Sequence, residues 1–92
     1  MIYQLEFSEQ FKRDIERHIK SGNKKLVAKI EQIIPELAQT PRSGIGKPEQ
    51  LKGFNQETWS RRIDSKHRIV YEIYDEVLSV YTISAYGHYD DK

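Results

Sequence analysis

The spacing of the apolar residues changes once along this chain, and that change limits the folds it can adopt. Between residues 8 and 40, apolar side chains recur every three or four positions, which is the period of a helix with one buried face. Between residues 59 and 85 they alternate with polar side chains or form short β-branched runs, as strands do. Residues 2–7 also alternate. The predicted order is strand, helix, helix and a series of strands, which is an α+β fold.

Capping and breaking residues set the limits of the two predicted helices. Ser8 can cap the first helix, and Asn23, after Ser21-Gly22, can cap the second. The short connection between them predicts a helical hairpin that packs on the sheet. Pro35 lacks an N–H, so we expect a kink or a restart of the second helix there. Thr40-Pro41 ends that helix.

The remaining sequence predicts a small twisted antiparallel sheet. Residues 42–50 contain two glycines and a proline and predict a loop, and residues 51–53 predict a short strand. Strands are expected at 59–63, 68–74 and 77–85, joined by short polar turns. The full order is then β-α-α-β-β-β, with one further short strand. In the first of the long strands, Trp59, Arg61 and Ile63 share one face, and Ser60 and Arg62 share the other.

Length and composition exclude several classes of protein. A chain of 92 residues without cysteine is long enough for one domain, 1–92, and offers no disulfide or thiolate metal site. This composition fits the cytoplasm. Its apolar runs are short, so no membrane span is expected, and its first residues do not resemble a signal peptide.

Positive charge is concentrated in the middle of the chain. The net charge is only +1, yet residues 42–68 contain seven Lys/Arg against three Asp/Glu. Such a segment on a nearly neutral protein suggests a local anionic ligand, although a solvated charged face is the simpler interpretation.

The polar residues include a set that could cleave RNA. This reaction needs a base for the 2′-OH, an acid for the departing 5′-oxygen and cations for the phosphate charge. Glu49, His88 and the arginines could supply these groups. Each also has a simpler interpretation, Glu49 as a loop carboxylate and His88 as a solvated histidine. We expect a surface role for His67 and a packing role for His18, and no histidine pair has zinc-like spacing.

Four blocks of sequence together resemble one known family. They are Lys47-Pro48-Glu49-Gln50-Leu51-Lys52-Gly53, Trp59-Ser60-Arg61-Arg62-Ile63, His67-Arg68-Ile69-Val70-Tyr71 and Gly87-His88-Tyr89. In this order and spacing they are similar to the YoeB/Txe toxins of bacterial toxin–antitoxin modules, within the RelE/ParE superfamily. The resemblance covers nearly the whole chain, whereas any one block alone would be weak evidence for the family.

The resemblance implies a fold, an activity and a set of site residues. The fold is microbial-ribonuclease-like, and the activity is that of an mRNA interferase, an endoribonuclease that cuts mRNA in the ribosomal A site without a metal or other cofactor. Glu49 is the implied general base, His88 the general acid and Arg68 the cation that stabilises the phosphorane. Binding of substrate or phosphate is expected from Lys52, Arg62 and Tyr89, and from Arg61 in the same basic strand.

The resemblance also implies partners. These are a YefM/Axe-type antitoxin, the ribosome and mRNA, a second copy of the chain in a homodimer, and operator DNA through the antitoxin only. No membrane partner is expected. A nearly neutral protein gains little affinity for naked RNA, so we expect cleavage to depend on positioning by the ribosome. Two alternatives remain open: a ParE-like gyrase inhibitor that needs no acid–base pair, and an inactive relative that only binds its antitoxin.

Overall fold

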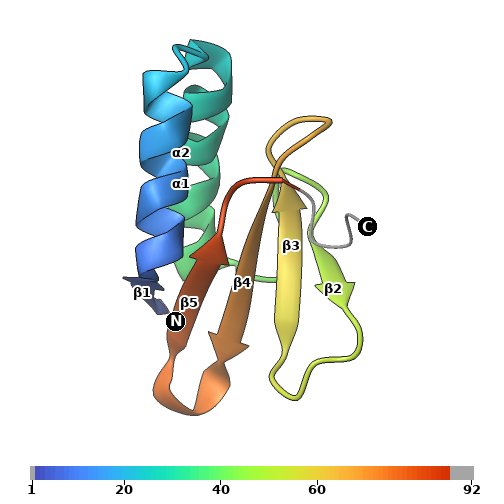
Figure 1. Cartoon of the computed structure of the whole chain (residues 1–92). Helices are drawn as coiled ribbons and strands as arrows, with labels where there is room; N and C mark the ends of the chain where they lie inside the picture. Colours follow the sequence, from blue (N-terminus) through green and yellow to red (C-terminus); the bar gives the residue numbers. More distant parts are fainter. Residues whose placement is uncertain (1, 88–92) are drawn as a thin grey trace.

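A computed structural model describes residues 2–87 of the chain. Two helices and five strands follow one another in the predicted order (Figure 1). They are β1 (Gln4–Phe7), α1 (Glu9–Lys20), α2 (Lys24–Gln39), β2 (Glu49–Leu51), β3 (Thr58–Arg62), β4 (Arg68–Tyr74) and β5 (Ser79–Ser84), with a 3-10 turn at Asp75–Val77 before β5. The predicted α+β class is confirmed.

The five strands form one sheet in the order β1-β5-β4-β3-β2. Strands β2 to β5 pair antiparallel, as predicted. The first strand departs from the prediction, because β1 pairs parallel with β5, in the register Gln4↔Ser79 to Phe7↔Thr82. The helical hairpin carries the chain from β1 to the opposite edge of the sheet, so the last strand completes the sheet beside the first.

Local capping fixes the start of both helices where the sequence predicts it. The Oγ of Ser8 accepts from the N–H of Phe11 at 2.9 Å, and Oδ1 of Asn23 accepts from the N–H of Leu26 at 3.1 Å. The hydroxyl of Ser8 also donates to the carbonyl of Ile83, which ties the start of α1 to β5. α2 continues from Lys24 to Gln39 with Pro35 inside it, so the expected restart was wrong.

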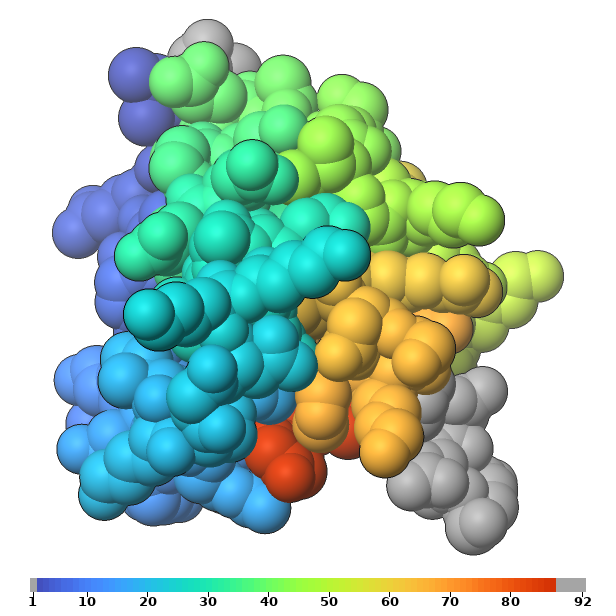
Figure 2. Space-filling view, turned by 90° about the horizontal axis from the view of Figure 1, so that it is seen from above, coloured from blue at the N-terminus to red at the C-terminus, as the bar shows by residue number. Residues whose placement is uncertain are grey.

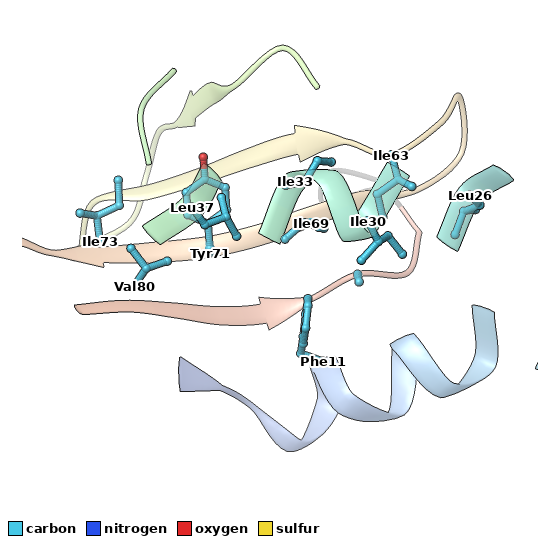
Figure 3. Close-up of a cluster of buried hydrophobic side chains, with 11 residues drawn as sticks. Phe11, Leu26, Ile30, Ile33, Leu37, Ile63, Ile69, Tyr71, Ile73 and Val80 are labelled. Carbon is cyan, nitrogen blue, oxygen red and sulfur yellow. The ribbon is translucent and has the colours of Figure 1, made fainter. Parts of the chain in front are cut away.

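The core lies between the helices and one face of the sheet (Figure 3). Every third or fourth residue of α2 points into it, beginning with Leu26 and Ile30. The sheet contributes the alternate residues Ile69, Tyr71 and Ile73 of β4, all at most 1% exposed. Each fully buried aliphatic side chain of this kind stabilises the fold by about 1.5–3 kcal/mol. The opposite face of β2, β3 and β4 is therefore left available for polar side chains.

Neither helix within residues 2–87 has the length and apolar character needed to cross a membrane.

Candidate active site

Strand register gathers the predicted polar residues on the sheet face that the helices do not cover. Glu49 pairs with Ser60, and Arg62 pairs with Arg68. Residues two apart in a strand share a face, so Ser60 and Arg62 lie on the same side of β3. This places a carboxylate and two guanidinium groups on neighbouring strands. Glu49 begins β2 instead of lying in a loop, so the strand predicted at 51–53 starts two residues earlier.

Arg68 and Glu49 meet across β3. Nη1 of Arg68 lies 3.5 Å from Oε1 of Glu49 and 3.4 Å from Oγ of Ser60, both at the outer limit of a hydrogen bond. The Glu49 side chain is 65% exposed, whereas that of Arg68 is only 17% exposed. A base must reach solvent-borne substrate, and a charge-stabilising cation acts most strongly when partly buried. The exposure of Glu49 suits a general base, and the partial burial of Arg68 suits a cation that stabilises charge.

The guanidinium of Arg68 has unused capacity for hydrogen bonding. Its Nε is buried and has no hydrogen-bond partner among the residues that the structure describes. An unpaired buried donor carries a free-energy cost, which an anionic ligand with oxygen acceptors would remove. Arg68 is thus held in place by weak contacts and remains able to bind a phosphate.

Arg62 and Lys52 are two further cations of the basic segment. Both side chains are exposed, and within residues 2–87 neither forms a salt bridge. The backbone N–H of Arg62 donates to the carbonyl of Gly46 at 2.6 Å, which joins β3 to the loop before Glu49. These two cations are available to a polyanion.

The chain approaches the same place again after β5. Figure 1 shows the segment after β5 crossing towards the end of β3. The backbone N–H of Arg68 donates to the carbonyl of Gly87 at 3.1 Å. The predicted His88 and Tyr89 lie outside the described residues. The residue just before them is nevertheless bonded to the main chain of Arg68.

Arg61 points in the opposite direction and corrects an expectation. Its side chain is fully buried, with Nη1 2.6 Å from Oε1 of Glu36 and Nη2 2.6 Å from the carbonyl of Thr40. Nη2 also donates to the carbonyl of Ser43 and Nε to Oη of Tyr71. A guanidinium enclosed in this way has no surface for a phosphate. The predicted phosphate contact of Arg61 is therefore wrong, because its donors hold the α2–β2 loop.

Two features of the α2–β2 loop depend on this buried arginine. At Gly44 a Cβ would lie 1.9 Å from Oε1 of Glu36 and 2.8 Å from Nη1 of Arg61, so only glycine fits. Burial raises the pKa of Tyr71, and its hydroxyl donates to the carbonyl of Pro41 at 2.6 Å. Gly44 thus permits close packing of the loop on Arg61.

Arg42 is also neutralised internally. Its guanidinium contacts Oε2 of Glu57 at 2.8 Å and Oδ2 of Asp75 at 2.7 Å. The hydrogen bond from Arg42 lowers the pKa of Glu57, and bonds from Tyr3 and Arg42 lower the pKa of Asp75. Arg42 and Arg61, two of the seven basic residues in 42–68, are therefore engaged in contacts within the protein. The basic surface is smaller than the sequence suggested and is concentrated near Glu49 and Arg68.

Sequence reasoning missed how the C-terminal segment is held. His18 is 2% exposed with Nε2 2.7 Å from the carbonyl of Ala85, which confirms its predicted packing role with one polar edge. Asp14 is 1% exposed and accepts from the N–H of Ala85 at 2.9 Å. His67 was expected at the surface but accepts from the N–H of Gly87. The available signal was that Asp14 and His18, four residues apart, share the apolar face of α1 with Phe11.

Among residues 2–87, no three His, Cys, Asp or Glu side chains are grouped so as to hold a metal ion.

Comparison with known proteins places the chain in a family. The sequence model described as "YoeB-like toxin of bacterial type II toxin-antitoxin system" matches residues 7–89. The chain belongs to the YoeB toxin family. A curated relative, Toxin YoeB of Synechocystis sp., is 47% identical over 68 residues, which cover 74% of this chain and 77% of the relative. The chain is thus the toxin component of a toxin–antitoxin system.

Solved structures support the same assignment. A YoeB/ParE toxin from Agrobacterium tumefaciens is 34% identical, with a TM-score of 0.81 over 94% of this chain and 99% of that one. YoeB of Staphylococcus aureus has been solved as a dimer, with a TM-score of 0.78 at 32% identity, and in a YoeB–YefM complex, with 0.74 at 33%. Each covers 97% of this chain and 100% of the other. The predicted RelE/YoeB-type fold is confirmed.

Proposed function

We propose that this YoeB-family toxin is a ribosome-dependent endoribonuclease that cuts mRNA in the ribosomal A site and so stops translation. The observation that carries the proposal is the contact between Glu49 and Arg68 across β3, with Gly87 bonded to the backbone of Arg68. A base, a phosphate-binding cation and the residue preceding His88 thereby meet at one place. Family membership makes this chemistry the natural interpretation of that arrangement.

Glu49 is the proposed general base. Its exposed carboxylate takes the proton of the 2′-OH, and the 2′-oxygen attacks the adjacent phosphorus. A bond forms from phosphorus to the 2′-oxygen as the bond to the 5′-oxygen breaks. His88 protonates that leaving oxygen. The products are a 2′,3′-cyclic phosphate and a free 5′-hydroxyl, and no other reactant is required.

Arg68 stabilises the charge that builds up on the phosphate oxygens. Its long contacts with Glu49 and Ser60 are readily exchanged for stronger ones to an anion. Arg62 and Lys52 contribute positive charge along the RNA backbone, and Tyr89 is the proposed surface on which a base stacks. Removing one such stabilising donor typically costs about 10²–10³-fold in rate.

The remaining local charge explains why the ribosome is needed. Arg42 and Arg61 are engaged internally, which leaves five of the seven cations of residues 42–68 to hold a free RNA. A protein docked on the ribosome can take its alignment from that particle.

We further propose a YefM-type antitoxin as partner, as for the YoeB of S. aureus, with operator DNA bound only through the antitoxin. A homodimer is proposed by analogy with the dimer of that protein. Ribosome-dependent action places the toxin in the cytoplasm.

Controlled expression in bacteria tests the proposal. The wild-type chain is expected to arrest growth and deplete mRNA, whereas Glu49→Gln and His88→Gln each relieve both effects, since each loses a proton-transfer group worth about 10²–10⁴-fold. Glu76→Gln changes an exposed carboxylate on the 3-10 turn and is the matched control, expected to behave as wild type. Full toxicity of both site variants, or cleaved DNA–gyrase complexes without mRNA loss, contradicts the proposal.

A further inference from the structure

The segment 85–87, which leads into His88, is held from two sides. On one side, Asp14 and His18 of α1 bond the N–H and the carbonyl of Ala85 at 2.9 and 2.7 Å. On the other, Nδ1 of His67 in the β3–β4 turn accepts from the N–H of Gly87 at 2.9 Å. Figure 2 shows the red end of the described chain between the blue and cyan helices and the orange turn. These contacts fix the main chain one residue before His88.

The contact to Gly87 requires one protonation state of His67. A backbone N–H can only donate, so Nδ1 must carry a lone pair, and the neutral ring has its proton on Nε2. An imidazolium carries protons on both nitrogens and cannot accept this bond. Protonation of His67 therefore breaks the contact that holds Gly87.

The ring of His67 is fixed in position by its neighbours. It meets His18 edge to face, with ring centres 4.7 Å apart, and lies 4.5 Å from the ring of Tyr86. Tyr86 also stacks on His18 and is covered by the guanidinium of Arg17, 3.6 Å from its ring centre. The imidazole therefore has little freedom to turn away from Gly87.

The turn that carries His67 is organised by Asp64. Its Oδ1 accepts from the N–H groups of Lys66 and His67 at 2.8 and 2.7 Å. Although partial burial opposes it, these two bonds lower the pKa of Asp64, which keeps the carboxylate ionised. The hydrogen-bonded turn therefore helps to fix the position of Nδ1 of His67.

Charges of both signs surround His67. From α1 it faces Arg17 and the titratable His18, and from the C-terminal segment it faces Tyr86. Its own turn contributes Asp64, which favours the imidazolium, and Lys66, which opposes it. Histidine is the side chain whose charge changes most readily near neutral pH, so the contact with Gly87 responds to pH.

We propose that His67 is a positioning residue for the ribonuclease reaction: the neutral imidazole holds Gly87, which accepts from the backbone N–H of Arg68 and directly precedes His88 in the sequence. The role rests on the proposed function of His88 as general acid. Cleavage is then full while His67 is neutral and falls as the pH drops through its pKa. A carboxylate base gives its own acid limb only near pH 4, so the two limbs are separable.

Two substitutions separate the hydrogen bond from the titration. His67→Asn puts an amide oxygen near the place of Nδ1 and can accept from Gly87 at every pH. His67→Ala removes the acceptor. Ser65→Ala, at a neighbouring exposed position of the same turn, is the matched control. Thermal unfolding of each variant confirms that it folds.

The first measurement, an NMR titration, does not depend on catalytic activity. In NMR spectra of the purified protein between pH 5 and 8, the amide of Gly87 should shift with the same midpoint as the ring of His67. In His67→Asn it should lack that titration, and in Ser65→Ala it should keep it. A Gly87 amide that ignores the titration of His67 overturns the proposal.

The second measurement is single-turnover cleavage of mRNA on programmed ribosomes from pH 6 to 8. His67→Ala is expected to lose about 10²-fold in maximal rate with unchanged half-saturation, since a misplaced catalytic group costs about that much. His67→Asn should keep most of the rate and lose the acid limb. Cleavage by His67→Ala at the wild-type rate overturns the positioning role alone. Absence of cleavage by the wild type overturns the proposed function and this role with it, even if Gly87 titrates.

Discussion

Arg61 and Arg62 are adjacent in sequence but lie in opposite environments. Arg61 faces the helices, is fully buried and binds Glu36 and three loop carbonyls. Arg62 faces the open side of the sheet and is exposed. Strand alternation alone separates them. The basic segment therefore has two functions: Arg61 holds the α2–β2 loop, and Arg62 presents charge to a ligand.

The largest expected effect comes from removing the buried member of the pair. Arg61→Ala removes a fully buried side chain together with its hydrogen bonds to the Glu36 carboxylate and to the carbonyls of Thr40 and Ser43, and should lower the free energy of unfolding by about 3 kcal/mol. Arg62→Ala, the matched exposed variant, should change it by less than about 0.5 kcal/mol. Urea denaturation measures both. Equal losses of stability in the two variants would contradict the different roles of Arg61 and Arg62.

Substitution of Arg68, a cation on the open face of the sheet, should reduce cleavage strongly and change stability little. Arg68→Lys keeps one positive charge but loses the planar fork and its buried Nε, so the rate of ribosome-dependent cleavage should fall by about 10²-fold. The unfolding free energy should stay within about 1 kcal/mol of wild type, since the contacts of Arg68 with Glu49 and Ser60 are long. Single-turnover kinetics and urea denaturation report the two quantities. A stable Arg68→Lys protein that cleaves at the wild-type rate would contradict the role of Arg68.

A smaller change in stability is expected from substitution of Arg42, which forms ion pairs with Glu57 and Asp75 near the surface. It lowers the pKa values of Glu57 and Asp75, and groups with lowered pKa stabilise the fold above their ordinary pKa near 4. That stability is lost as the pH falls through the lower values of the folded state. Arg42→Ala should therefore lower the unfolding temperature slightly at pH 7 and weaken the loss of stability as the pH falls below the ordinary carboxyl pKa. Thermal unfolding across that range measures this, and an unchanged acid dependence would rule out the ion-pair network as its source.

The sequence predicted those parts of the fold that depend on neighbouring residues. The caps at Ser8 and Asn23 and the strand 68–74 follow from local chemistry and alternation. The parallel pairing of β1 with β5 joins residues about 75 positions apart and has no local signature. The three residues of β2 have weak strand propensity, so their place was set only by pairing with β3.

The candidate site was predictable in composition but not in geometry. The chemistry of RNA cleavage pointed to Glu49, His88 and the arginines, and the resemblance to a family assigned their roles. The proximity of Glu49 to Arg68, in contrast, depends on the order of strands across the sheet. The burial of Arg61 had a signal, since alternation placed it on the face of Trp59 and Ile63. The contact of His67 with Gly87 had none, because two turns far apart in sequence create it.

The most direct test of the central claim is to map mRNA 3′ ends in a translating bacterial extract with the wild-type chain and with Glu49→Gln. We predict new ends confined to the codon in the A site for the wild type, about 10²-fold fewer for Glu49→Gln, and none when translation is blocked before elongation. Cuts scattered along untranslated RNA, or equal cleavage by the two proteins, would contradict a ribosome-dependent reaction based on Glu49 and Arg68.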